Sequence, residues 1–88
     1  MYRRELKLGP MLYIREYLRS GTFQLSRDLV RVDFVDAVEL SKYILFSAIE
    51  IDGTEDLTNL ILVVNGSCAI ALSDEQYYKL DDFINGVE

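Results

Sequence analysis

ILVVNGSCAIALSDEQ, residues 61–76, decides the fold, because it joins a strand pair directly to the start of a helix. Asn65 and Gly66 stand between two apolar runs, and an Asn-Gly pair in that setting predicts a two-residue hairpin turn. This turn predicts four cross-strand pairs: Val64 with Ser67, Val63 with Cys68, Leu62 with Ala69 and Ile61 with Ile70. A serine that follows such a run, Ser73, is typical of a helix N-cap.

Both faces of this hairpin are apolar, but they differ in relief. Because side chains alternate along a strand, one face carries bulky residues: Ile61, Val63, Cys68, Ile70 and Leu72. The other face, here named the small-residue face, sets large residues beside small ones: Leu60, Leu62, Val64, Ala69 and Ala71. An uncovered apolar face of this size is an aggregation hazard. We expect a helix on the bulky face, and the N-terminal segment or a second chain on the small-residue face.

A homodimer through the small-residue face is the version we favour. A chain of 88 residues buries a smaller share of its unfolded surface than a larger domain does, so it gains much from a shared core. Two-fold pairing is also the commonest form of assembly. We therefore expect the protein to self-associate.

The segment from Ser73 to Gly86 predicts a C-terminal helix. Gln76 stands three residues after Ser73, which is the spacing of a capping box, and Gly86 fits the position just past a helix end. A buried stripe is formed at helical spacing by Tyr77, Leu80, Phe83 and Ile84. The opposite face, here named the acidic helix face, gathers Asp74, Glu75, Tyr78, Asp81 and Asp82.

Residues 10–20 are open to two interpretations. Pro10 fits the first position of a helix, Gly21 fits the residue after its end, and Met11, Ile14 and Leu18 then fall on one face. The alternative is a hairpin in which YIREYLR and TFQLS flank Ser20-Gly21. We expect the helix.

The middle of the chain predicts strands. Val30, Val32 and Phe34 alternate with charged residues, as in a strand with one wet face. The residues from Tyr43 to Ile51 are rich in β-branched and aromatic side chains, which favour a further strand. The chain is therefore expected to be one α+β domain, 1–88, with a mostly antiparallel sheet of about four strands. A C-terminal helix packs on one face of that sheet, and an N-terminal helix completes the fold.

The composition excludes several chemistries and places. The chain has no histidine, so it has no histidine base or histidine metal ligand, and a single Cys68 allows neither an internal disulfide nor a zinc cluster. The first residues form no secretory signal, and LILVV, the longest apolar run, is far shorter than a membrane span. We expect a cytoplasmic protein without a cofactor, a bound metal or a membrane partner.

Charge is divided unevenly along the chain. Residues 1–31 hold seven Arg or Lys against three acids, a net charge of +4, whereas residues 32–88 hold two lysines against twelve acids, a net charge of −10. The basic third mixes cations with Tyr2, Tyr13 and Tyr17, as nucleic-acid surfaces often do. The candidate contacts are Arg3, Arg4, Lys7, Arg15 and Arg19. The overall charge of −6 opposes binding to phosphates, so this hypothesis is disfavoured.

A second acidic group lies in IEIDGTED: Glu50, Asp52, Glu55 and Asp56. Clustered carboxylates can hold a divalent cation, but their spacing differs from the twelve-residue calcium loop. A solvated turn is the simpler interpretation, and a carboxylate-based enzyme is the least favoured function. The leading hypothesis is a non-enzymatic protein-binding or regulatory module, an inhibitor that docks its acidic helix face on a basic partner surface. Nucleic-acid binding is the alternative.

Overall fold

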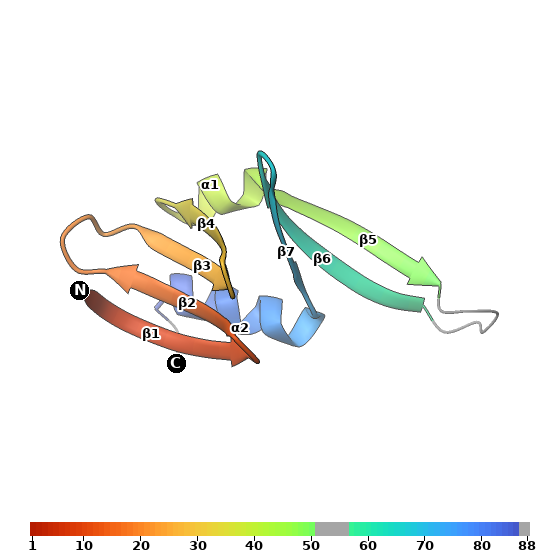
Figure 1. The fold of residues 1–88 in the computed structure, drawn as a ribbon, viewed down its shortest axis with the longest axis horizontal. Helices are drawn as coiled ribbons and strands as arrows, with labels where there is room; N and C mark the ends of the chain where they lie inside the picture. The colour runs from red at the N-terminus through yellow and green to blue at the C-terminus, as the bar shows by residue number, and fades with distance from the viewer. Residues whose placement is uncertain (51–56, 87–88) are drawn as a thin grey trace.

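In the computed structural model of the protein, the described residues form two antiparallel β-sheets and two helices (Figure 1). The backbone is described for residues 1–50 and 57–86, and the side chains for residues 1–45 and 61–86. The first sheet is a meander of β1 (Tyr2–Gly9), β2 (Leu12–Tyr17), β3 (Phe23–Arg27) and β4 (Val30–Phe34). The second sheet has the order β5 (Ile44–Glu50), β6 (Leu57–Asn65) and β7 (Cys68–Leu72). The helices are α1 (Ala37–Lys42), between the sheets in the chain, and α2 (Asp74–Ile84).

The core lies where the inner faces of both sheets meet α2. The first sheet contributes its buried side chains from all four strands: Leu8, Leu12, Ile14, Phe23, Leu25, Val32 and Phe34. The second sheet contributes Ile61, Val63, Ile70 and Leu72, and the helices contribute Leu40, Leu80 and Phe83. Helix α2 contacts β1, β6 and β7, and β4 lies beside β7. One core therefore serves both sheets, and α2 connects them.

The predicted α+β class, the antiparallel pairing and the C-terminal helix are confirmed, but the one expected sheet of about four strands is instead two sheets of four and three strands, and the predicted N-terminal helix is wrong. Residues 10–20 hold the β1–β2 turn and all of β2, and β2 pairs with β3 as in the competing hairpin interpretation. Pro10 lies in the turn, where Met11 adopts a φ of 56°. The segment forms a strand rather than a helix because the alternation of a strand places both Leu12 and Ile14 in the core, each with no exposed surface.

The predicted strands in the middle of the chain are confirmed as β4 and β5. Between them, the short helix α1 begins after Asp36, whose Oδ1 accepts a hydrogen bond from the Glu39 N–H at 2.8 Å. Its single buried side chain is Leu40, and Tyr43 ends it. Helix α1 thus carries the chain from the first sheet to the second.

The β6–β7 hairpin forms, but its turn is one residue further along the chain than predicted. Asn65 pairs with Cys68, so the turn residues are Gly66 and Ser67. Gly66 takes a φ of 63°, the positive value that a type II′ turn requires at its first central residue. The shift leaves every residue on its predicted face because the period of a strand is two. The bulky face is buried accordingly: Ile61, Val63, Ile70 and Leu72 are each at most 5% exposed.

Candidate interaction surfaces

Helix α2 is fixed at its first turn by side chains on both sides of its start. The Ser73 Oγ accepts a hydrogen bond from the Gln76 N–H at 3.2 Å, and the Gln76 Oε1 accepts one from the Ser73 N–H at 3.0 Å. These two bonds complete the predicted capping box. The Gln76 Nε2 also donates to the Leu8 carbonyl oxygen at 3.4 Å, so the start of α2 is tied to β1.

The acidic helix face is turned to solvent for most of its residues. Asp74, Glu75, Tyr78 and Asp82 are exposed, and Asp81 is half-buried. Tyr78 is 68% exposed, and its ring meets the Tyr77 ring edge-on with centroids 6.3 Å apart. Burial raises the pKa of Tyr77, and the negative charge of Asp81 adds to the shift. Lys79 Nζ lies 3.4 Å from Glu75 Oε1 and is the nearest compensating cation on the helix. The face therefore presents an aromatic ring within a negative field.

The outer face of the first sheet carries a cluster that we name the tyrosine–arginine face: Tyr2, Tyr13, Arg15 and Tyr17. The Arg15 guanidinium lies over two rings, 4.9 Å from the Tyr2 centroid and 4.8 Å from the Tyr13 centroid. Its Nε donates to Glu5 and its Nη1 donates to the Ser26 Oγ at 3.2 Å. The hydrogen bond to Glu5 raises the pKa of Arg15, which therefore stays charged.

A chain of side-chain hydrogen bonds crosses the same face toward β4. The Tyr17 hydroxyl donates to the Gln24 Oε1 at 2.9 Å, and the Gln24 Nε2 donates to the Asp33 Oδ1 at 3.0 Å. Gln24 is only 9% exposed, so these partners replace the water that it lacks. Burial raises the pKa of Tyr17, and the neighbouring Tyr2 adds to the shift. The face is thus ordered by its own contacts.

The predicted basic set does not form one patch. Lys7 and Arg15 meet around Tyr13, with the Lys7 Nζ 6.0 Å from the ring centroid. Arg4 lies on the opposite face of the sheet, bonded to Glu16 at 2.6 Å and placed 4.3 Å from the centroid of the Phe83 ring. Arg3 and Arg19 are exposed. Arg31 lies outside the predicted set; it pairs with Ser26 on β3 and lines the same hollow as Arg15.

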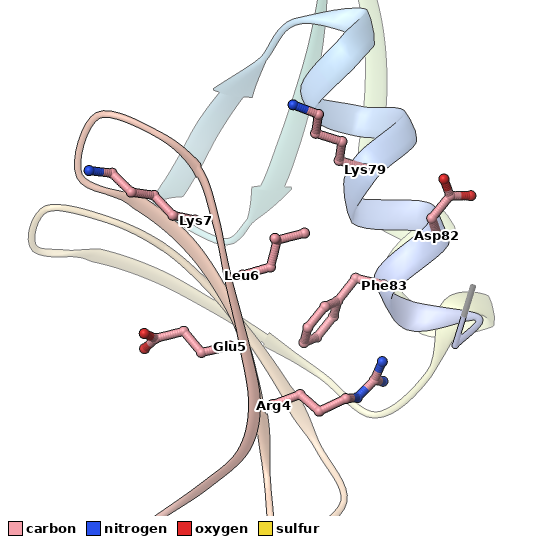
Figure 2. A pocket seen from close by; sticks show the side chains of 7 residues that line it. All are labelled: Arg4, Glu5, Leu6, Lys7, Lys79, Asp82 and Phe83. Carbon is pink, nitrogen blue, oxygen red and sulfur yellow. The ribbon is translucent and has the colours of Figure 1, made fainter. Parts of the chain in front are cut away.

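A groove of about 580 Å³ runs between β1 and α2. Figure 2 shows Leu6, Arg4 and Phe83 turned into the space between the strand and the helix, while Glu5 and Lys7 point to the other side of β1. Leu6 is 36% exposed, whereas Phe83 is 7% exposed and forms the floor. Groove residues on the helix side also include Lys79 and Asp82. The alternation of β1 therefore turns Arg4 and Leu6 toward the groove, and Glu5 and Lys7 to the other side of the strand.

The small-residue face is partly covered. Leu62, Val64 and Ala71 are half-buried, Ala69 is exposed, and the side chain of Leu60 lies outside the described residues. Leu45 on β5 pairs directly with Leu62 and is 57% exposed, so it extends this face beyond the predicted set. The structure does not test self-association through this face, and strand β1, an edge of the first sheet, offers a competing site for it.

The remaining predicted features add no site to these surfaces. The acidic side chains of residues 50–56 lie outside the described residues. In the described parts of the chain, no three His, Cys, Asp or Glu side chains gather as metal ligands would. None of the described helices has the length and apolar character needed to cross a bilayer. No protein-family model, curated protein or solved structure matches this chain.

Proposed function

We propose that this chain is a non-enzymatic protein-binding module that docks the acidic helix face of α2 on a basic surface of another protein. The observation that carries the proposal is the exposed ring of Tyr78 within that face. Tyrosine is among the residues that contribute most binding energy at protein interfaces. The surrounding carboxylates would steer a basic partner and fix its orientation. Inhibition of that partner is the regulatory outcome we expect.

The rigidity of α2 supports this proposal. A docking surface that is already ordered loses little conformational entropy on binding. The capping box fixes the start of α2, and Leu80 and Phe83 anchor its inner side in the core. The ring of Tyr78 is therefore offered on a scaffold that does not need to fold on binding.

A pair of charge-matched variants tests the proposal by affinity capture from a lysate of the native host. Glu75→Gln with Asp82→Asn removes two negative charges from the acidic helix face. Leu29→Lys with Val38→Lys adds the same net charge elsewhere, at positions that are 86% and 67% exposed. We expect the helix variant to lose the proteins that the parent captures, and the control to keep them. Equal recovery by both variants would overturn the proposal.

Nucleic-acid binding through the tyrosine–arginine face is a second candidate function. The observation that favours it is a guanidinium flanked by two tyrosine rings on an open sheet, because such rings can stack on bases. Its test is the affinity for a single-stranded oligonucleotide as a function of salt. Binding through this face should weaken steeply with salt, and Lys7→Ala should reduce that slope by about one. No binding at low salt would remove this candidate.

A further inference from the structure

Strand β1 is an edge of the first sheet, and its outward backbone groups can be identified. The Tyr17 N–H donates to the Thr22 carbonyl oxygen, so Tyr17 directs its backbone groups toward β3. Because this direction alternates along an antiparallel strand, Ile14 and Glu16 direct theirs toward β1. Ile14 pairs with Leu6 and Glu16 with Arg4. The N–H and C=O groups between them, those of Glu5 and Lys7, therefore point away from the sheet.

One end of this edge is covered and the other is open. At the covered end, the Gln76 side chain donates to the Leu8 carbonyl oxygen. It also packs so closely on Gly9 that a Cβ there would lie 2.7 Å from the Gln76 Nε2. At the open end, residues 4–7 line the groove beside α2. An added strand would therefore pair with Glu5 and Lys7 and stop before Gly9.

Among the self-pairing registers centred on Glu5, Leu6 and Lys7, the charges of this edge favour one. In a two-fold antiparallel pair, the register centred on Leu6 sets Glu5 opposite Lys7 of the second copy, and does so twice. The registers centred on Glu5 or on Lys7 set two like charges opposite each other. Cross-strand pairs of opposite charge stabilise a sheet by about 0.2–1 kcal/mol each, and like charges destabilise it.

We propose that β1 pairs with β1 of a second copy of this chain, antiparallel and centred on Leu6, so that two four-stranded sheets become one. The outward backbone groups of Glu5 and Lys7 form the new ladder, and the two Leu6 side chains meet across the two-fold axis. The groove provides the space for the incoming leucine, against Leu6 and the Phe83 ring. Of the acidic helix face, Asp82 lines the groove and Tyr78 does not, so the Tyr78 ring lies outside the groove that the second copy enters.

The test is sedimentation velocity of the full chain over a range of concentrations, with two charge-reversal variants. Lys7→Glu and Glu5→Lys each set like charges opposite one another at both positions of the register. We expect the parent to dimerise. The dissociation constant of the dimer should be at least about tenfold higher for each variant than for the parent. An equimolar mixture of the two variants restores both opposite-charge pairs. Native mass spectrometry with one variant labelled with ¹⁵N should therefore find the mixed dimer in excess over either homodimer.

The mixture also distinguishes a lost interface from a lost fold, since a variant that fails to fold cannot form the mixed dimer. Ala69→Lys supplies the comparison, because it places a charge on the small-residue face and leaves β1 intact. We expect Ala69→Lys to dimerise as the parent does. A parent that stays monomeric at the highest soluble concentration would overturn the proposal. A dimer that Ala69→Lys abolishes and Lys7→Glu preserves would overturn it equally, and would assign the interface to the small-residue face.

Discussion

At the scale of single residues, Tyr17 and Tyr77, two of the three tyrosines whose pKa is raised, make stability depend on alkaline pH. Tyr17 and Tyr77 are neutral in the fold, and burial holds the pKa of each above 10.0, the usual value for tyrosine. As pH rises past that value, the unfolded chain loses these protons before the folded chain does, which favours unfolding. We therefore expect the free energy of unfolding, measured in urea, to fall as pH rises through 10 and above. With Tyr17→Phe and Tyr77→Phe combined, the fall should be smaller. An equal fall in the parent and the double variant would contradict the assignment.

Leu80 is the residue on which the packing of α2 depends most. It is fully buried where α2 meets both sheets, and its neighbours on those sheets are themselves buried. Leu80→Ala removes one methine and two methyl carbons from the core and leaves a cavity, so it should lower the free energy of unfolding by about 2–5 kcal/mol. Chemical denaturation measures the difference. A Leu80→Ala protein as stable as the parent would show that this side of α2 does not face a core.

At the scale of secondary-structure elements, the start of α2 should depend on one hydroxyl. Ser73→Ala removes the acceptor for the Gln76 N–H and is expected to cost about 0.5–2 kcal/mol of unfolding free energy. The Gln76 side chain keeps its own bonds to Ser73 N–H and to Leu8. Ser73→Asn is the matched control, because asparagine is also a good N-cap residue. A loss of equal size in both variants would mean that the cap is not what stabilises this end.

Helix α2 could be predicted from the sequence because several independent local signals agree there. A capping pair, acidic residues in the first turn and a stripe at helical spacing all indicate one element. Residues 10–20 lack that agreement. Tyr13 and Tyr17 lie on the outer face of β2 but count as apolar in a pattern, so they hide the alternation of Leu12 and Ile14. Gly21 does take a positive φ of 67°, as predicted for a helix end, but it takes it in a hairpin loop.

The β6–β7 hairpin shows which errors of register matter. The predicted turn was displaced by one residue, yet the buried and open faces were assigned correctly. A hairpin turn that moves along both strands by one residue changes the cross-strand partners without changing the face of any side chain. The alternation of the local sequence was therefore enough to predict the face of each side chain. The first turn residue is Gly66 rather than Asn65, and Gly66 takes the positive φ that this turn needs.

At the scale of the whole molecule, the arrangement of the candidate surfaces could be predicted only in part. The acidic helix face follows from helical spacing alone, and the structure leaves most of it exposed. The basic set could not be placed without the strands, because alternation along β1 sends Arg4 to the inner face and Lys7 to the outer face. Leu45 reaches the small-residue face only through its pairing with Leu62, which is distant in the sequence.

The basic and acidic parts of the chain lie in different parts of the fold. The basic third builds the first sheet, where Arg4 and Arg15 are paired with Glu16 and Glu5. Those cations are therefore compensated within the same sheet, and the one ion pair that an acid of α2 makes among the described residues joins Glu75 to Lys79. The surface of α2 consequently carries much of the net charge of −6 outward. This distribution favours a basic partner over a phosphate backbone.

The most direct test of the central claim, that α2 presents a docking face, uses Tyr78→Ala in two measurements on the same protein. Tyr78 is 68% exposed, so its truncation should change the free energy of unfolding by no more than about 1 kcal/mol. We predict that recovery of the parent's dominant protein partner in affinity capture falls strongly, while urea denaturation stays close to that of the parent. Undiminished recovery of that partner by a folded Tyr78→Ala protein would contradict the claim.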